Sequence, residues 1–318
     1  MGTYIARRLV LMVPVAFLVS VIAFALLRLT PGDPVIVYAG EERDPATLDA
    51  LRREFGLDQP LPSQYVTWVT RAVRLDFGRS IRTRQPVSEA IVERFPATLE
   101  LGGIALVLSI TVGLVIGTLS ALRRNSPLDL AASGFTLAGV SLPNFFLGLV
   151  LILVFGLAVR LFPPGGYTAL KDDAVDNLRH LVLPAVTLAT ASMAVNLRQV
   201  RSSLLDVLGQ EYMRTARAKG LREAVVVARH ALKNALIPVV TIFGLQVGAI
   251  LEGAVITEQV FSWPGVGKLA VDSIAGRDYP VVQAIVLLSA LSFMFTTLVV
   301  DVLYGILDPR ISYGRRGA

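Results

Sequence analysis

Residues 101–122 read LGGIALVLSITVGLVIGTLSAL, and no charged side chain occurs in them between Glu100 and Arg123. A helix needs about 20 consecutive apolar residues to cross a lipid bilayer, so this stretch is long enough to span one. Across all 318 residues, 54% are hydrophobic and only 17% are charged, whereas soluble domains have about 25% charged residues. The composition excludes an ordinary soluble protein and indicates an all-α polytopic membrane protein.

Five further uncharged stretches surround this one along the chain. They are residues 9–27, 130–159, 181–197, 235–251 and 280–300. The second of them is too long for one untilted helix and contains Pro143, so we expect a kink, a tilt or an interfacial start there. The first follows two arginines, as a signal peptide would, but it exceeds the usual apolar core of about 7–15 residues. Six transmembrane helices are therefore predicted.

Lys and Arg are distributed unevenly among the segments that connect these stretches. If the N-terminus is cytoplasmic, the segments on that side hold several times as many Lys and Arg residues as the two short outer loops, which is the bias that sets topology. The long segment of residues 30–98 is also rich in arginine, but segments of this length cross the membrane largely regardless of charge. Both termini are therefore expected in the cytoplasm, and the net charge of +6 reflects topology rather than nucleic-acid binding.

The segment between the first two spans, residues 30–98, leaves the membrane at a cluster of proline and glycine. Two stretches in it, residues 46–55 and 65–75, carry apolar residues at helical spacing with polar residues between them. They predict short amphipathic helices that form a small external cap. An equally open interpretation is a tether on the lipid headgroups, anchored by Tyr65 and Trp68.

The segment between spans four and five, residues 199–234, is the most informative one on the cytoplasmic side. A run of helix-forming residues with small Ala216 and Ala218 ends at Gly220, which suits the left-handed conformation that caps a helix. A second short helix then begins, so the segment presents a compact knob that a partner's backbone can approach closely. The alternative is a positively charged loop that only sets topology, but that does not account for its length or for the glycine.

The sequence offers little for catalysis or for a cofactor. It contains no Cys, which excludes disulfides, thiol nucleophiles and Cys-ligated metals within the chain. Its two histidines, His180 and His230, fall on opposite sides of the membrane in this topology, so they cannot share a metal site. Residues 265–269 are similar to a phosphate-binding loop, but Ser262 and Leu269 stand where that motif requires Gly and Ser or Thr. We therefore expect no catalytic residues, no metal and no cofactor.

Two motifs in the cytoplasmic segment and seven elsewhere carry a family resemblance. Residues 211–221 read EYMRTARAKGL and residues 230–238 read HALKNALIP. The others, in order over nearly the whole chain, are TPGDP at 30–34, FGLDQP at 55–60, FPATLE at 95–100, SLP at 141–143, FSWPG at 261–265, RDYP at 277–280 and DPR at 308–310. Together they resemble the integral membrane subunit of ABC importers, in the branch of dipeptide, oligopeptide and nickel permeases.

This resemblance implies the fold of a type I ABC importer permease, and it makes residues 199–234 the loop that couples to an ATPase. The coupling residues implied are Glu211, Arg214, Thr215, Ala216, Ala218, Lys219, Gly220 and Leu221. ABC importers generally carry Glu-Ala-Ala before the glycine, whereas the corresponding positions here are Arg214, Thr215 and Ala216. Glu211 lies one helical turn earlier and could take the role of the missing acid.

The resemblance also implies partners and a location. The partners are two ATPase subunits or one fused pair, a second homologous permease, for which the family favours a paralogue, and an extracytoplasmic substrate-binding protein. ATP hydrolysis then belongs to the partners, and the chain is a transport subunit in the lipid of a bacterial or archaeal inner membrane. Its divisions are residues 1–29 with the first helix, residues 30–98 outside, residues 99–310 as the transmembrane domain, and residues 311–318 as a cytoplasmic tail.

Two acidic residues near the end of the fifth span, Glu252 and Glu258, are candidates for the translocation path. Ionisable groups within spans tend to face the bundle interior or a cavity, and a peptide's amino terminus could be met there. The expected cargo is a di- or oligopeptide, and a nickel or metal-chelate importer of the same branch is the alternative. An ion-coupled secondary transporter would show inverted repeats and charges at the membrane midplane, for which the sequence gives no convincing sign.

Overall fold

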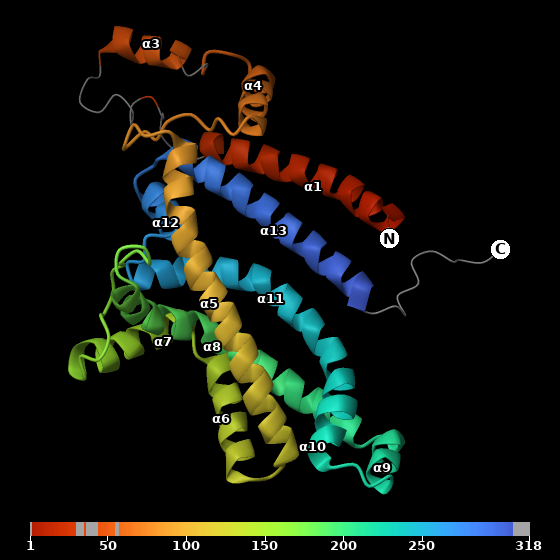
Figure 1. Ribbon diagram of the computed structural model, residues 1–318. Helices are drawn as coiled ribbons and strands as arrows, with labels where there is room; N and C mark the ends of the chain where they lie inside the picture. The colour runs from red at the N-terminus through yellow and green to blue at the C-terminus, as the bar shows by residue number, and fades with distance from the viewer. Residues whose placement is uncertain (1, 30–34, 36–43, 55–56, 308–318) are drawn as a thin grey trace, which may run out of the picture. The chain divides into compact units, whose positions relative to one another are not determined.

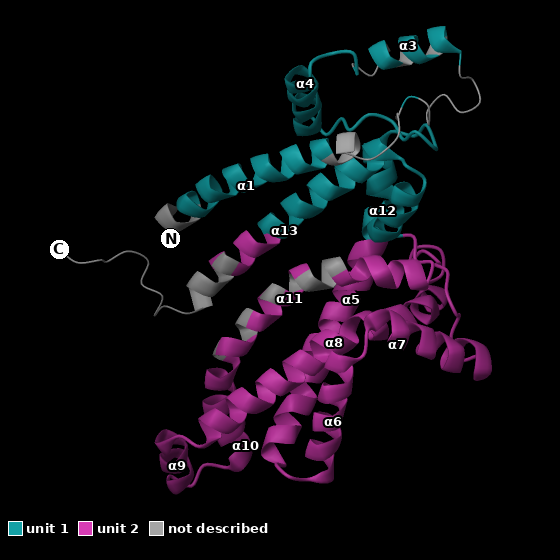
Figure 2. Ribbon diagram, turned by 180° about the vertical axis from the view of Figure 1, so that it is seen from behind, with its two compact units in different colours: residues 1–96, 265–295 teal, residues 97–264, 296–318 magenta. Residues whose placement is uncertain are grey.

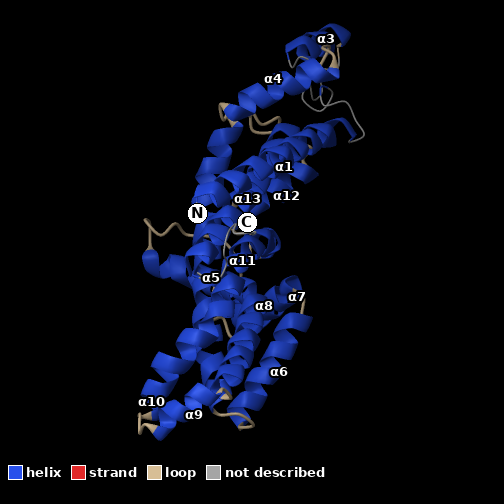
Figure 3. Cartoon of the chain, turned by 90° about the vertical axis from the view of Figure 1, so that its right-hand side faces the viewer, coloured by secondary structure: helices blue, strands red, loops and turns tan. Residues whose placement is uncertain are grey.

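The computed structural model describes residues 2–29, 35, 44–54 and 57–307 (Figure 1). In these residues the regular elements are helices, apart from an isolated bridge between Arg79 and Pro86 (Figure 3). The expected all-α fold is thereby confirmed. The chain divides into two compact units, residues 1–96 with 265–295 and residues 97–264 with 296–318 (Figure 2).

The named helices in the described part of the first unit are four whole helices and the beginnings of two longer ones. They are α1 (Gly2–Leu29), α3 (Pro45–Glu54), α4 (Leu61–Val73), α12 (Val266–Ala275), and the first parts of α5 (Val87–Leu122) and α13 (Tyr279–Leu307). Helices α3 and α4 lie where the two amphipathic helices were predicted. The buried core of this unit consists of Ala72, Phe77, Val87, Ile91, Val281, Ala284, Ile285 and Leu287.

Helix α4 packs on α1 through its aromatic side chains. The Tyr65 hydroxyl lies 2.7 Å from the Ser20 hydroxyl, and the Tyr65 ring meets Phe24 edge-on with centroids 5.3 Å apart. Trp68 lies 5.9 Å from the same Phe24 ring. Because both aromatic rings are used in packing within the chain, these contacts favour a packed cap over a tether that places the rings among lipid headgroups. The side of the membrane on which the cap lies stays a prediction.

The second unit is built around the long helix α8. Its elements among the described residues are the later part of α5, α6 (Pro127–Ser141), α7 (Asn144–Leu151), π-helix η1 (Ile152–Ala158), α8 (Ala174–Leu208), α9 (Glu211–Ala218), α10 (Glu223–Val225), π-helix η2 (Val226–Ala231), α11 (Leu232–Val260) and the last part of α13. Helix α8 contacts α6, α7 and α11. It also lies so close to α5 that a Cβ on Gly113 would be 2.5 Å from the Cβ of Asn196, so α5 needs glycine there.

In the part of the chain that the structure describes, four single helices are long and apolar enough to cross a membrane, at Ala6–Ala25, Val87–Leu122, Ala174–Leu208 and Tyr279–Val300. A fifth crossing follows if α6 and the α7–η1 pair form one span. Helix α11 covers the fifth predicted stretch, but the side chains of several of its residues lie outside the described ones. The structure therefore supports four or five spans, and six remains a prediction.

The break in the third predicted span lies at Leu142 and Pro143, where α6 and α7 meet at 111°. Pro143 has no amide hydrogen and disfavours the helical conformation of the residue before it. Leu142 accordingly has an extended backbone, with φ −83° and ψ 125°. The expected kink at Pro143 is thus confirmed as a sharp bend.

Candidate functional site

The segment of residues 199–234, singled out by the sequence, forms two short helices at one end of the second unit (Figure 1). Helix α9 begins after Gln210, and Glu211 lies in its first turn while Arg217 lies in its last, so both charges suit the helix dipole. The helix ends at Ala218, Lys219 is its C-cap, and Gly220 follows with a φ of +75°. This left-handed conformation confirms the predicted cap at Gly220 and turns the chain toward α10.

Helix α9 is attached to the rest of the unit by one apolar face. Met213 is 0% exposed and Ala216 is 8% exposed, and their spacing of three places them on the same side. They belong to a buried cluster with Ala121, Leu204, Val226, Ala231 and Ala235. The cluster joins α9 to the ends of α5, α8 and α11, so a force on α9 acts on three long helices.

This packing changes the interpretation of Ala216. The sequence suggested that its small side chain lets a partner come close, but the structure turns it inward, where it lets α9 lie close to its own chain. Sequence reasoning missed Met213, although a Met three residues before a small Ala in a strongly amphipathic helix was a usable signal.

The other predicted coupling residues lie on the outer surface of the segment. These exposed residues are Glu211, Arg214, Thr215, Ala218, Lys219, Gly220 and Leu221. Glu211 and Arg214 pair with each other at 2.9 Å on this surface. Leu221 is 40% exposed, so the surface combines charges with an uncovered apolar side chain. That combination is typical of a protein contact.

A bidentate ion pair fixes the angle between the two short helices. The Arg217 guanidinium donates to both carboxylate oxygens of Glu223, at 3.1 and 2.8 Å. This hydrogen bonding lowers the pKa of Glu223 below its usual range and raises the pKa of Arg217. The pair spans the turn at Gly220, and the Asn234 amide donates to the Tyr212 hydroxyl at 3.1 Å. Neither contact was predicted from the sequence. Together they hold the segment in a defined shape.

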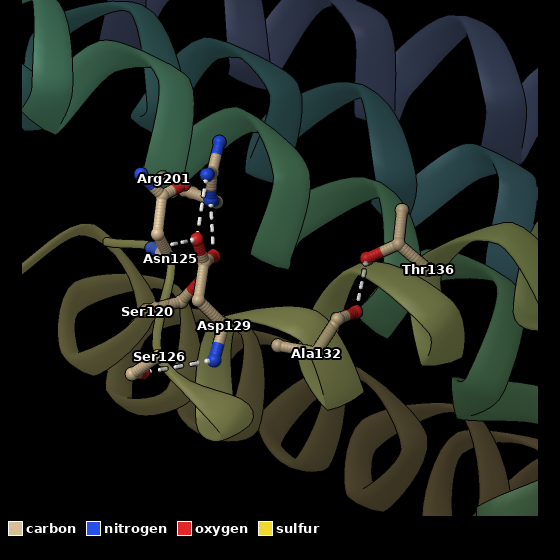
Figure 4. A network of polar contacts seen from close by, with 7 residues as sticks. All are labelled: Ser120, Asn125, Ser126, Asp129, Ala132, Thr136 and Arg201. Carbon is tan, nitrogen blue, oxygen red and sulfur yellow. Dashed lines mark hydrogen bonds and ion pairs between the residues drawn. The ribbon is translucent and has the colours of Figure 1, made fainter. Parts of the chain in front are cut away.

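A buried carboxylate ties together the helices on which this segment rests. Asp129, 3% exposed, accepts from the Arg201 guanidinium at 2.6 and 2.9 Å and from the Asn125 amide at 2.9 Å (Figure 4). The Ser120 hydroxyl also donates to it. These partners come from the end of α5, the following turn and α8. The cluster, which we call the Asp129 clamp, holds α5, the start of α6 and α8 together.

The structure describes one of the two acidic candidates for the translocation path. Glu258 is 0% exposed and accepts a hydrogen bond from the Thr98 hydroxyl at 2.7 Å, while the Trp263 indole donates to the Ala97 carbonyl at 2.8 Å. These contacts join the early part of α5 to the end of α11. The side chain of Glu252 lies outside the described residues. A role for either carboxylate toward cargo stays a prediction.

Comparison with known proteins agrees with this architecture. The family described as "Binding-protein-dependent transport system inner membrane component" matches residues 113–313. The chain belongs to this family. The corresponding N-terminal family, "Binding-prot-dependent transport system membrane comp, N-term", matches residues 1–102 of the permease. The expected membership is thereby confirmed, as is the expectation of a transport subunit rather than an enzyme.

Curated relatives match the permease along nearly its whole length. The di/tripeptide transport system permease protein DppB of Pseudomonas aeruginosa is 45% identical over 99% of this chain and 100% of its own. The oligopeptide transport system permease protein AppB of Bacillus subtilis is 42% identical over 98% of this chain and 100% of its own. The glutathione transport system permease protein GsiC of Escherichia coli is 43% identical, with the same coverage as AppB.

Solved structures share the fold at low sequence identity. The inward-facing MetNI methionine ABC transporter matches with a TM-score of 0.57 and 17% identity, over 69% of the permease and 96% of that chain. An amino acid ABC transporter matches with a TM-score of 0.52 and 17% identity, over 68% of the permease and 94% of that chain. The helical fold is therefore that of ABC importer permeases. The family is one of inner-membrane components. The side of the membrane on which the termini of this chain lie stays a prediction.

Proposed function

We propose that this chain is the permease subunit of an ATP-driven importer for di- or oligopeptides delivered by an extracytoplasmic binding protein. One observation carries the proposal: relatives with 42–45% identity over essentially their whole length are named as permeases for di- and tripeptides, oligopeptides and glutathione. These cargoes share a peptide backbone, so short peptides are the class that best accounts for all three names.

In this proposal α9 is the element that receives the motion of an ATPase. Its outer surface offers Arg214, Lys219 and Leu221 to a groove on the partner, while Met213 anchors it among the ends of three long helices. A short, packed element of this kind moves as a rigid body and passes displacement to the helices it rests on. Two ATPase subunits, a second homologous permease and six spans with both termini inside complete the proposed assembly.

Reconstitution into vesicles tests this function. The permease is purified with its paralogue and ATPases, and uptake of a labelled dipeptide is measured with ATP, the binding protein and, separately, an imposed ion gradient. We expect uptake that requires both ATP and the binding protein. Uptake that follows the ion gradient without ATP would refute the proposal.

Competition experiments test the cargo in the same vesicles. An excess of unlabelled dipeptide, tripeptide or glutathione should reduce the uptake of the labelled peptide, whereas a nickel chelate should not. If a nickel chelate is taken up and peptides do not compete with it, the importer belongs to the metal-transporting side of the branch instead.

A further inference from the structure

The first unit carries a dense group of arginines at the end of α4 and in the hairpin that follows it. The group consists of Arg71, Arg74, Arg79, Arg82 and Arg84, all exposed, with Asp76 as the one acidic residue among positions 71–84. We call residues 71–84 the arginine hairpin. In the expected topology the hairpin lies on the extracytoplasmic side. The tendency of Lys and Arg to gather in cytoplasmic loops therefore does not account for its arginines.

Buried groups hold the hairpin in one shape. The Ser80 amide donates to the Gln85 carbonyl at 2.9 Å and the Val87 amide to the Gly78 carbonyl at 3.0 Å. Asp278, only 3% exposed, accepts from the Ile81 amide at 3.0 Å. The Ser80 hydroxyl, itself 2% exposed, donates to the same carboxylate.

Burying the Asp278 carboxylate beside the hairpin costs free energy, and the hydrogen bonds that offset this cost fix the shape of the hairpin. Burying a carboxylate is unfavourable and is tolerated only where hydrogen bonds replace its water. Here Asp278, from the turn between α12 and α13, directs its oxygens to the side chain and amides of residues 80–82. The carboxylate therefore fixes the backbone that displays Arg79, Arg82 and Arg84.

Four of the five arginines are not used for ion pairs with other described residues. Among the described residues, Arg71, Arg74, Arg79 and Arg82 form no salt bridge, and the Arg79 guanidinium donates instead to the Arg84 carbonyl at 3.0 Å. The Arg82 side chain passes beside Gly276, 3.7 Å from where a Cβ would stand. The exposed Arg277 follows directly, so the cationic surface continues to the end of α12.

A set of exposed guanidinium groups on a fixed backbone is suited to carboxylates on another protein. Guanidinium groups bind carboxylates in a planar, two-pronged geometry, which a fixed backbone preserves. Anionic lipid headgroups move freely and need no such fixed display. Charge attraction also raises the rate at which two proteins associate. The resulting contact is reversible, as repeated delivery of cargo requires.

We propose that the arginine hairpin is the docking surface for an acidic patch on the extracytoplasmic substrate-binding protein. This inference rests on the proposed function, because it takes a binding protein as the partner. It adds which surface of this chain is used and the chemistry that the partner must present.

The test uses the reconstituted importer and the binding protein that supports its uptake. The concentration of binding protein that gives half-maximal uptake is measured for the wild type and for the double variant Arg74→Gln/Arg82→Gln. The matched control, Arg52→Gln/Arg53→Gln, removes two arginines from α3 in the same external segment. Each is measured at low salt and at about 0.5 M salt, where charge attraction is screened within a few ångströms.

We expect the hairpin variant to raise the half-maximal concentration about tenfold at low salt, with the maximal rate unchanged, and the difference to shrink at high salt. The α3 control should stay near the wild type. An unchanged half-maximal concentration, or an equal rise in the control, would overturn the proposal. So would a difference that appears only in vesicles containing phosphatidylglycerol, because that would assign the surface to lipid.

A second measurement does not depend on the arginine variants being stable. Thr83→Cys adds a cysteine at the tip of the hairpin, and the natural chain has none, so a photoreactive maleimide marks this position alone. Illumination should link it to the binding protein in nanodiscs without ATP, and high salt should suppress the link. No link, or one that salt does not affect, counts against the proposal. Absence of ATP-driven uptake in the wild type would instead refute the proposed function.

Discussion

At the scale of single residues, Gly220 sets the direction in which the chain leaves α9. Its φ of +75° is unfavourable for any residue with a Cβ, although no heavy atom lies within 4 Å of where that Cβ would be. Gly220→Ala should therefore cost about 1–2 kcal/mol through backbone strain rather than through a clash. We expect weaker co-purification of the ATPases and slower ATP-driven uptake.

Gly209→Ala is the matched control for this prediction. Gly209 ends α8 with φ −78°, which any residue adopts, and a Cβ there would make only ordinary contacts, the nearest at 3.6 Å. If both variants lose the ATPases equally, the special backbone of Gly220 is not the cause.

Met213 gives a second prediction at this scale. It is fully buried, and truncating a buried Met to Ala typically costs about 2–5 kcal/mol. Met213→Ala should release α9 from the helix ends and let it unfold locally, so that trypsin cleaves after the already exposed Arg214, Arg217 and Lys219 faster than in the wild type in inside-out vesicles. Uptake should fall with the loss of this anchor.

Leu221→Ala separates anchoring from contact with the ATPase. Leu221 is 40% exposed, so its loss should weaken ATPase attachment while the resistance of α9 to trypsin stays at the wild-type level. Equal sensitivity of both variants to trypsin would show that the two faces of α9 do not have separate roles.

What the sequence could predict at this scale depends on how local the cause is. The conformation of Gly220 was predictable, because a glycine after a helix-forming run caps the helix by its own backbone preference. The direction of Ala216 and the role of Met213 were not, since both depend on residues far along the chain such as Leu204 and Ala235. The Arg217–Glu223 pair needed the turn between them to be known first.

At the scale of helices, the Asp129 clamp decides whether α5, α6 and α8 move together. Replacing one partner of a buried ion pair leaves the other charge uncompensated, which typically costs about 3–5 kcal/mol. The Arg201 side chain is 27% exposed and can reach some water, so Asp129→Asn should fall at or below the lower end of that range. A drop of several degrees in the thermal unfolding midpoint of the purified complex is expected.

Arg198→Gln serves as the control, because Arg198 lies one turn earlier on α8 and is exposed. Its unfolding midpoint should equal that of the wild type. A normal midpoint for Asp129→Asn would show that the clamp does not stabilise the permease.

Element positions were predictable where composition or proline determines them. Uncharged stretches located the long helices, and Pro143 located the bend between α6 and α7. The clamp was not predictable, because Asp129 and Arg201 are far apart in sequence and nothing local pairs them. The contact by which Asp278 fixes the arginine hairpin was missed for the same reason, because Ser80 and Asp278 are 198 positions apart in the sequence.

At the scale of the whole molecule, family membership and the helical fold agree with what the sequence predicted. Composition alone does not determine the number of spans. A bent pair of helices such as α6 with α7–η1 can either cross the membrane or turn back to the side from which it entered. Sidedness was predicted from Lys and Arg in the loops, and this bias does not determine the side of a segment as long as residues 30–98. Direct labelling decides this point.

Thiol labelling of a Lys219→Cys variant tests the central claim, which is that α9 lies in the cytosol and is bound by an ATPase. The natural chain has no cysteine, so a membrane-impermeant maleimide reports on this position alone. The account predicts no labelling in intact cells, labelling in inside-out vesicles stripped of ATPases, and protection when the ATPases are restored. Labelling from outside intact cells, or labelling that the ATPases do not reduce, would contradict it.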